Sequence, residues 1–102
     1  MKLLGVTACA AGVAHTFMAA EAIANAAKAK GIDMKVETQG AMGIENRITP
    51  EEVAAADAVI MTNDIPIRER ERFVGKKIFN VSSTDCIKSA PKIIEAVEEH
   101  CK

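Results

Sequence analysis

Residues 2–17 read KLLGVTACAAGVAHTF and join an apolar run to the start of a helical pattern through a short loop. The run from Lys2 to Thr7 is apolar on both faces, which is typical of a central strand in a parallel sheet. The loop that follows contains Cys9 and Gly12. This strand, loop and helix decide the fold, and they place one thiol at their junction.

The helical pattern after the loop predicts a helix over roughly residues 15 to 30. Apolar residues recur there at intervals of three and four, which predicts one buried stripe made of Val13, Phe17, Ala20, Ala24 and Ala27. Gly31 stands where a helix commonly ends in a left-handed residue. We therefore expect this helix to end at Gly31.

Three further segments read as strands. Residues 58–61 are apolar on both faces and predict a second central strand. Residues 34–37 alternate and residues 77–81 are mixed, as expected for strands with one face or edge near solvent. We place the latter two at the edges of the sheet.

The remaining segments predict three more helices. Thr49, Pro50 and Glu52 form a helix start with an N-cap and a capping-box glutamate, so a short helix should cover about residues 50 to 56. A short helix after Pro66 would contain the charged run 68–72, whose alternating signs predict a solvated face, with docking of a partner as the alternative. The last helix has Ser89 as its N-cap and an apolar stripe made of Ile87, Ala90, Ile94, Val97 and Cys101.

Strands that alternate with helices predict parallel pairing with right-handed crossovers. With the two apolar strands in the middle, the prediction is a single α/β domain over residues 1–102. It is a three-layer sandwich with a four-stranded parallel sheet of order 2-1-3-4 and helices on both faces. Ligands bind such sheets at the carboxyl ends of the strands where the order reverses, between the first and third strands. Cys9 follows the first strand and therefore lies at that crevice.

Composition excludes several classes of function. The net charge of -1 gives no footprint for nucleic acid, and no apolar run approaches the roughly 18 residues that membrane insertion requires. The three cysteines are widely spaced, with no Cys-x-x-Cys pair, so we expect neither a metal site nor a disulfide framework. Reduced thiols and the absence of a signal peptide predict a cytoplasmic protein.

The position of Cys9 favours phosphate chemistry. A helix N-terminus stabilises a thiolate and offers backbone N–H groups to phosphate oxygens. The donors predicted to hold the phosphate come from the rest of the loop and the first helical turn, namely Ala10, Ala11, Gly12, Val13, Ala14, His15 and Thr16. The alternatives are that Cys9 is a small buried residue and that His15 and Thr16 only cap the helix.

Known phosphate motifs narrow the chemistry. The loop lacks the Gly-Lys-Ser/Thr end of a nucleotide P-loop and the spacing of a dinucleotide fold. It resembles the Cys-x5-Arg signature of cysteine phosphatases, but His15 occupies the arginine position. Hydrolysis also needs an acid, and Asp57, Asp64 and Asp85 carry no distinctive motif. The residues therefore predict a phosphoryl carrier more convincingly than a hydrolase.

The motifs are similar to those of a known family. VTAC (6–9), GVAHTFMAAE (12–21), ETQG (37–40) and GIEN (43–46) resemble the fructose-specific IIB component of the bacterial phosphotransferase system, and the similarity covers almost the whole chain. The family commonly has Pro-Thr or Pro-Ser after the cysteine, whereas this chain has Ala10 and Ala11.

The resemblance implies a relay without a cofactor. A phosphohistidine of the IIA component would donate its phosphoryl group to Cys9, and the phosphocysteine would pass it to fructose or a related sugar held by the membrane-embedded IIC component. A small cysteine phosphatase remains the alternative from another class. A non-catalytic interaction module on the same fold is the third reading, for which Ala10 and Ala11 are the only hint.

Two other groups of polar residues are predicted at the same end of the sheet. Glu45, Asn46 and Arg47 follow the second strand and would either contact a partner or fix their own loop. Asp64 follows the third strand, with capping of the helix at Pro66 as its alternative role.

Overall fold

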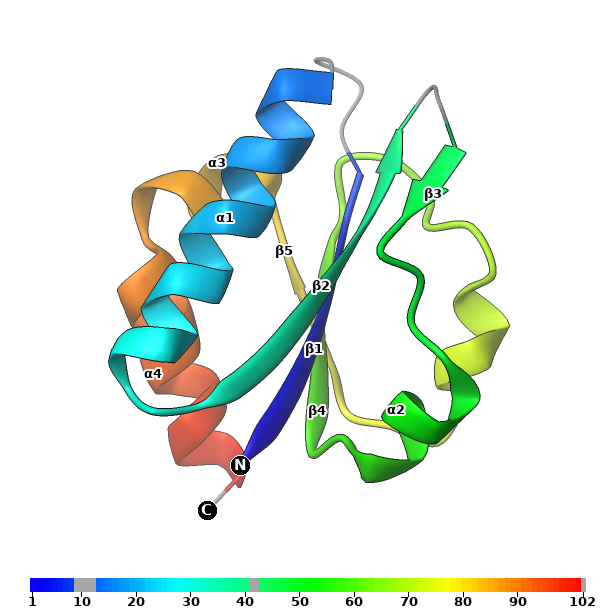
Figure 1. The fold of residues 1–102 in the computed structure, drawn as a ribbon. Coiled ribbons are helices and arrows are strands. Elements are labelled where there is room, and N and C mark those ends of the chain that lie inside the picture. The colour runs from blue at the N-terminus through cyan, green and yellow to red at the C-terminus, as the bar shows by residue number, and fades with distance from the viewer. Residues whose placement is uncertain (9–12, 41–42, 102) are drawn as a thin grey trace.

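The computed structural model describes residues 1–8, 13–40 and 43–101. Its centre is a five-stranded sheet of order β3-β2-β1-β4-β5 (Figure 1). The strands are β1 (Lys2–Thr7), β2 (Asp33–Gly40), β3 (Gly43–Glu45), β4 (Ala58–Thr62) and β5 (Ile78–Val81). β1 pairs in parallel with β2 and β4, and β4 pairs in parallel with β5. The predicted order of these four parallel strands is confirmed.

The prediction of a purely parallel, four-stranded sheet is wrong, because β3 adds a fifth strand antiparallel to β2. Its pairs are Thr38 with Glu45, Gln39 with Ile44 and Gly40 with Gly43. With only three residues, β3 is too short to show an alternating pattern in the sequence. As a result β2 is an interior strand, whereas β5 lies at the edge as predicted.

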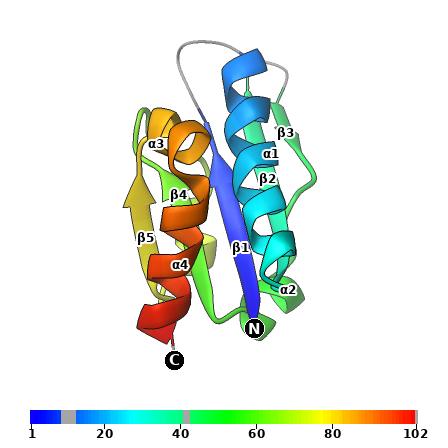
Figure 2. The same cartoon turned by 90° about the vertical axis from the view of Figure 1, so that its left-hand side faces the viewer.

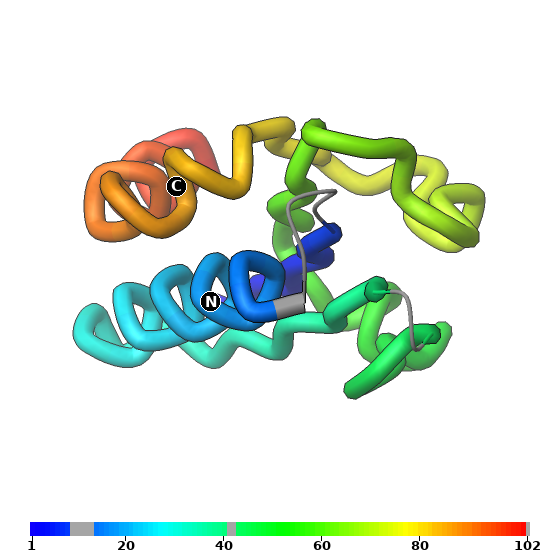
Figure 3. Tube along the Cα trace, turned by 90° about the horizontal axis from the view of Figure 1, so that it is seen from above, coloured from blue at the N-terminus to red at the C-terminus, as the bar shows by residue number. Residues whose placement is uncertain are grey.

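The helices cover both faces of the sheet (Figures 1 and 2). They are α1 (Val13–Ala29), α2 (Pro50–Ala55), the 3-10 helix η1 (Arg70–Phe73), α3 (Ser83–Lys88) and α4 (Ala90–Cys101). Seen from above, α1, α3 and α4 lie on one side of the strands, and α2 and η1 lie on the other (Figure 3). The predicted three-layer arrangement is confirmed. No helix within the described ranges is long and apolar enough to cross a membrane.

Local signals explain where several helices begin and end. At α2, the Thr49 hydroxyl accepts from the Glu52 N–H while the Glu52 carboxylate accepts from the Thr49 N–H, which is the predicted capping box. α1 ends before Gly31, whose φ of 73° lies in the left-handed region that glycine adopts readily. The final segment differs from the prediction, because Ser82 caps a separate short helix, α3, and Ser89 lies between α3 and α4.

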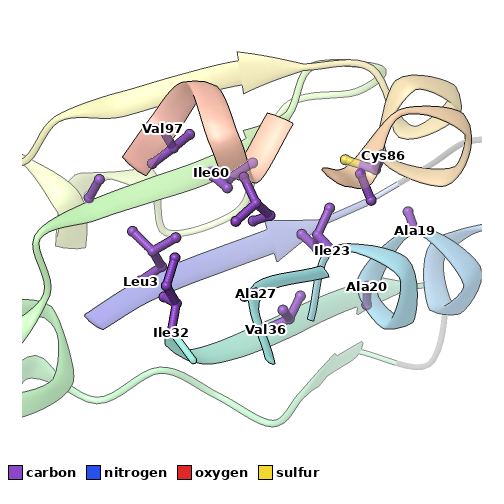
Figure 4. Close-up of a cluster of buried hydrophobic side chains, with 13 residues drawn as sticks. Leu3, Ala19, Ala20, Ile23, Ala27, Ile32, Val36, Ile60, Cys86 and Val97 are labelled. Carbon is purple, nitrogen blue, oxygen red and sulfur yellow. The ribbon is translucent and has the colours of Figure 1, made fainter. Parts of the chain in front are cut away.

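One apolar cluster joins α1, α3 and α4 to the sheet (Figure 4). Figure 4 shows Ala19, Ile23 and Ala27 of α1 in this cluster together with Leu3 and Ile60 of the strands. A Cβ atom on Gly5 would lie 2.9 Å from Met34 Cε and 3.2 Å from Ile23 Cδ1, so glycine allows α1 to approach β1 closely. A second cluster on the other face contains Phe73 and Met61.

The buried stripe predicted for α1 needs correction. Ala20 and Ala27 are buried, but Ala24 is half-buried and Phe17 is exposed by 43%. The side chain of Val13 lies outside the described residues. Alanine occurs on several sides of α1, so the apolar pattern does not fix one rotation of the helix. Ile23 marks the face that packs on the sheet.

Candidate functional site

The predicted site lies where the order of the parallel strands reverses. The connection from β1 to β2 runs over one face through α1, and the chain reaches β4 over the other face through α2 (Figure 1). The carboxyl ends of β1 and β4 therefore meet at the predicted switch point. Cys9, Ala10, Ala11 and Gly12 lie outside the described residues, so their predicted roles stay predictions. Their two flanks are the end of β1 and the start of α1.

The end of β1 is held by buried hydroxyl groups. The Thr62 hydroxyl accepts from the Ala8 N–H at 2.9 Å and donates to the Ala8 carbonyl at 3.0 Å. The Thr7 hydroxyl donates to the Thr16 carbonyl at 3.2 Å and so ties β1 to the first turn of α1. Thr7 and Thr62 are almost completely buried. The backbone on both sides of residues 9–12 is therefore fixed by side chains of the sheet.

The first turn of α1 contains four of the predicted phosphate-binding residues, of which Val13 has a side chain outside the described part of the structure. Ala14 is exposed, His15 is half-buried and Thr16 is 2% exposed. An exposed alanine leaves the surface of this turn uncovered, and the predicted use of its backbone stays a prediction. Thr16 is almost completely buried, and its predicted contact with the phosphate stays a prediction.

His15 belongs to a chain of hydrogen bonds that joins three elements. His15 Nδ1 lies 3.2 Å from the Ser83 hydroxyl oxygen, and the Ser83 hydroxyl donates to Asp64 Oδ2 at 2.8 Å. The Ser83 N–H donates to Asp64 Oδ1 at 2.7 Å. Asp64 thus binds the first residue of α3 rather than capping a helix at Pro66. The prediction that Asp64 shares the site's end of the sheet is confirmed, whereas Ser83 was missed.

A second buried network lies beside the end of β2. Glu37 is fully buried, and both of its carboxylate oxygens accept from Arg72. Glu37 Oε1 also accepts from the Ile48 N–H, and Oε2 accepts from the Gln39 amide. Burial by itself would raise the pKa of Glu37, but these hydrogen bonds outweigh it and the pKa lies below its ordinary value. Glu37 is therefore a buried carboxylate held ionised.

The charged run 68–72 is only partly the solvated face that its sequence predicts, because Arg68, Arg70 and Glu71 are exposed whereas Glu69 and Arg72 are half-buried. Arg72 pairs with Glu37, and Gln39 exchanges hydrogen bonds with the N–H and carbonyl of Arg68. The Arg68 guanidinium donates to the carbonyl of Gly40. The sequence pattern does not show these pairs, because the partners are far apart in the chain and meet only in the folded structure. The run fixes the loop before η1 to the carboxyl end of β2.

Asn46 and Arg47, which follow β3, fix the segment after that strand, which is one of the two predicted alternatives. Asn46 donates from its side chain to the Val36 carbonyl at 2.9 Å. Arg47 forms a bidentate pair with Glu69 at 2.6 Å and 3.0 Å. Glu45 is exposed. These contacts hold the segment after β3 against β2 and the loop before η1.

A groove between α1 and the strands β2 and β3 does not match the predicted phosphate chemistry. It has a volume of about 480 Å³ and is lined mainly by apolar side chains, among them Phe17 and Met34. Glu21 and Glu45 also line it, against one lysine, Lys35. Two carboxylates disfavour a phosphate there. We therefore expect the phosphate at the start of α1 rather than in this groove.

The other thiols differ from the predicted nucleophile. Cys86 is buried in the cluster of α1, α3 and α4, and burial, with the nearby charges of Asp64 and Asp85, raises its pKa to about 12. Cys101 is half-buried at the end of α4. No group of three or more metal-ligating side chains occurs in the part of the chain that the structure describes. Cys86 therefore has the properties of a core residue.

Comparison with known proteins decides the family. The family described as PTS system, Lactose/Cellobiose specific IIB subunit matches residues 4–96. The chain belongs to the PTS IIB family. The resemblance inferred from the motifs around Cys9 and Gly40 is confirmed by this match and by fructose-like relatives.

Relatives of the IIB chain have fructose-like names. It is 56% identical over 99 residues to PTS system fructose-like EIIB component 2 of Escherichia coli K12, which covers 97% of this chain and 93% of that protein. It is 50% identical over 99 residues to PTS system fructose-specific EIIB'BC component of the same strain, covering 96% of this chain but 17% of that protein. The IIB domain thus matches one part of a much longer relative.

Solved structures of the IIB family share the fold. A domain of the fructose-specific IIABC component of Borrelia burgdorferi has 45% sequence identity and a TM-score of 0.88, covering 96% of this chain and 93% of that one. The lactose-specific IIB domain of Streptococcus pneumoniae has 21% identity and a TM-score of 0.57, covering 100% of this chain and 98% of that one, which is a likeness of fold alone.

Proposed function

We propose that this IIB chain is a phosphoryl carrier of a fructose-type phosphotransferase system, with Cys9 as the phosphorylated residue. The observation that carries the proposal is the junction of β1 and α1 at the switch point of the sheet, with His15 in the first turn of the helix. The phosphate-binding groups would be backbone N–H groups of Ala10, Ala11, Gly12, Val13, Ala14, His15 and Thr16, with the imidazole of His15 and the hydroxyl of Thr16 as further donors.

The proposed relay has two balanced steps. The Cys9 thiolate attacks the phosphorus of a phosphohistidine on the IIA partner. An S–P bond forms as the N–P bond breaks, and the departing imidazole nitrogen keeps the electron pair. In the second step a sugar hydroxyl oxygen attacks the same phosphorus, the S–P bond breaks, and the hydroxyl proton leaves to a base or to water. The thiolate is then ready for another cycle.

The sugar and the membrane partner are inferred from relatives. The fructose-like names belong to relatives at 56% and 50% identity, whereas the lactose-specific domain shares 21%. The longer relative, whose name joins EIIB and C, supports a IIC partner that holds fructose or a similar sugar. We place the carrier in the cytoplasm, where a reactive thiol stays reduced.

The described residues favour a carrier over a phosphatase. Both carboxylate oxygens of Asp64 accept hydrogen bonds from Ser83, so this carboxylate already has a structural role at the start of α3. Asp57 accepts from the N–H of Lys2, at the opposite end of β1 from the site. The four arginines of the chain are residues 47, 68, 70 and 72, so the loop and first turn of α1 contain none. A phosphatase loop of this kind would lack its guanidinium clamp.

Exposed apolar side chains beside the site suit contact with the donor protein. Phe17 and Met18 directly follow the predicted phosphate-binding residues and are exposed by 43% and 53%. Such side chains next to a reaction centre favour a protein surface as the partner. We expect Met18→Ser to raise the KM for phosphorylated IIA while Val74→Ser, at an 82% exposed apolar residue after η1, leaves it unchanged. Equal KM values for both variants would contradict this placement of the donor.

Hydrolysis of an aryl phosphate in the absence of a partner protein distinguishes a phosphatase from a carrier. The carrier is expected to leave an aryl phosphate intact when no partner protein is present. Partner-free release of phosphate, lost in Cys9→Ser and kept in Cys101→Ser, would instead establish a phosphatase. A protein that neither accepts phosphate from IIA nor hydrolyses the ester would be the non-catalytic module.

A further inference from the structure

The hydrogen-bond chain from Asp64 through Ser83 to His15 has a defined direction. An ionised aspartate only accepts hydrogen bonds, and both of its oxygens are used by Ser83, at 2.7 Å from the backbone N–H and 2.8 Å from the hydroxyl. The Ser83 hydroxyl has one proton, which it gives to Asp64 Oδ2. Its oxygen therefore accepts at His15, and the proton between them belongs to His15 Nδ1.

We propose that Ser83 and Asp64 are positioning residues that hold His15 with its proton on Nδ1, so that Nε2 is the ring nitrogen turned to the phosphoryl group. This inference rests on the proposed carrier function. The orienting pair acts through the imidazole and does not itself touch the phosphate. Nε2 serves a phosphoryl oxygen as a donor when the ring has both of its protons.

The packing of α1 against α3 fixes the positions of the residues in this hydrogen-bond chain. Ser83 is fully buried as the first residue of α3, and its backbone and hydroxyl are both bound to Asp64. One turn further along each helix, Ala19 of α1 and Cys86 of α3 belong to the same apolar cluster (Figure 4). The two helices thus meet at the hydrogen bond and again at the cluster.

Asp64→Asn should reverse the donor and acceptor roles along the hydrogen-bond chain while the positions of the side chains stay the same. The N–H of Ser83 requires the amide oxygen of an asparagine, so the amide nitrogen replaces Oδ2 and donates to the Ser83 hydroxyl oxygen. The Ser83 proton must then point to His15, whose neutral ring accepts at Nδ1 and has its proton on Nε2. Ser83→Ala removes the link altogether.

Ring nitrogen spectra test the proposal on the unphosphorylated protein. Long-range proton–nitrogen NMR, recorded with neutral imidazole rings, is expected to show His15 protonated on Nδ1 in the natural chain and on Nε2 in Asp64→Asn. His100, the other histidine, packs edge-on against Phe79 and is the internal reference. Ser82→Ala is the matched control, since Ser82 caps α3 without joining the chain. A His15 ring pattern that is the same in all these proteins would overturn the proposal.

Transfer kinetics supply the second readout. Ser83→Ala and Asp64→Asn are expected to slow phosphorylation by IIA about tenfold, the lower end of the loss seen when the residue that orients a metal-binding histidine is removed. The KM for the donor should not change, and Ser83→Ala should cost nothing further in a His15→Ala background. Transfer at the natural rate in both variants would overturn the positioning role. A natural chain that accepts no phosphate on Cys9 would refute the proposed function instead, whatever the ring spectra show.

Discussion

Arg72 and Glu37 are 35 positions apart in the chain, yet the two Nη atoms of Arg72 donate to the two carboxylate oxygens of Glu37 at 2.8 Å and 2.7 Å. Glu37 is in β2 and fully buried, and Arg72 comes from η1 on the far side of a loop. The pair anchors η1 and the loop before it to the strand that runs beside β1. It therefore supports the carboxyl end of the sheet, where the proposed site lies.

Removing Arg72 should destabilise the fold strongly. Arg72→Met leaves a buried carboxylate without its charged partner, which typically costs about 3 kcal/mol. Arg70→Met changes an exposed arginine of the same 3-10 helix and should change the free energy of unfolding by less than about 0.5 kcal/mol. Urea denaturation measures both. Equal stability of the two variants would show that the ion pair contributes nothing.

Acid should weaken the fold through Glu37. Its pKa in the folded protein lies below the ordinary value of 4.5, so the unfolded chain binds the proton more readily. The stabilisation is complete above the unfolded pKa and is lost as the pH falls through the folded pKa. Glu52 acts in the same direction, because a hydrogen bond from Lys35 helps to lower its pKa to about 2. Denaturation at stepped pH should show a smaller loss in Glu37→Gln, and an unchanged slope would contradict this assignment.

The thiol of Cys86 should resist alkylation in the folded protein. Its pKa is raised to about 12 by burial and by the charges of Asp64 and Asp85, so almost no thiolate exists at neutral pH. Peptide mass analysis after iodoacetamide treatment is expected to find Cys86 unmodified, and modified once urea unfolds the chain. Cys101, which is half-buried, is the reference thiol. Rapid labelling of Cys86 in the native state would refute the packing of α3 on α1.

The capping box of α2 has a measurable contribution. Thr49→Ala removes the acceptor for the Glu52 N–H and should cost about 1 kcal/mol. Thr84→Ala is a matched change at an exposed threonine of α3 and should stay within about 0.5 kcal/mol of the natural chain. Thermal or urea unfolding compares them. A Thr49→Ala protein as stable as Thr84→Ala would mean that the cap is dispensable.

Local patterns predicted most of the fold. The apolar run from Lys2 to Thr7 gave β1 with its observed bounds, and the N-cap at Thr49 gave the start of α2. These signals are local, so a sequence shows them directly. β3 was not predicted, because it has three residues and depends on pairing with β2. The N-cap at Ser82 is a detectable signal for the start of α3. The prediction missed this helix because it counted Ile87 of α3 as part of the apolar stripe of the last helix.

Only the position of the proposed site at the end of β1 was predictable from the sequence, and the residues that support it were not. The strand, loop and helix around Cys9 predicted the switch point, and the order of strands confirms that location. Ser83 and Arg72 were missed because nothing near them in the chain shows what they contact. Their roles depend on Asp64 and Glu37, which the fold brings to them from 19 and 35 residues away. Buried charge and buried hydroxyl networks of this kind become visible only with the tertiary structure.

Phosphorylation of the chain by a phosphorylated IIA protein tests the central claim most directly. After incubation, peptide mass analysis should locate one phosphoryl group on Cys9, and Cys9→Ser should abolish it while Cys101→Ser leaves it in place. Adding IIC-containing membranes and fructose should then move the group to the sugar. A phosphoryl group found on another residue, or one that persists in Cys9→Ser, would contradict the account.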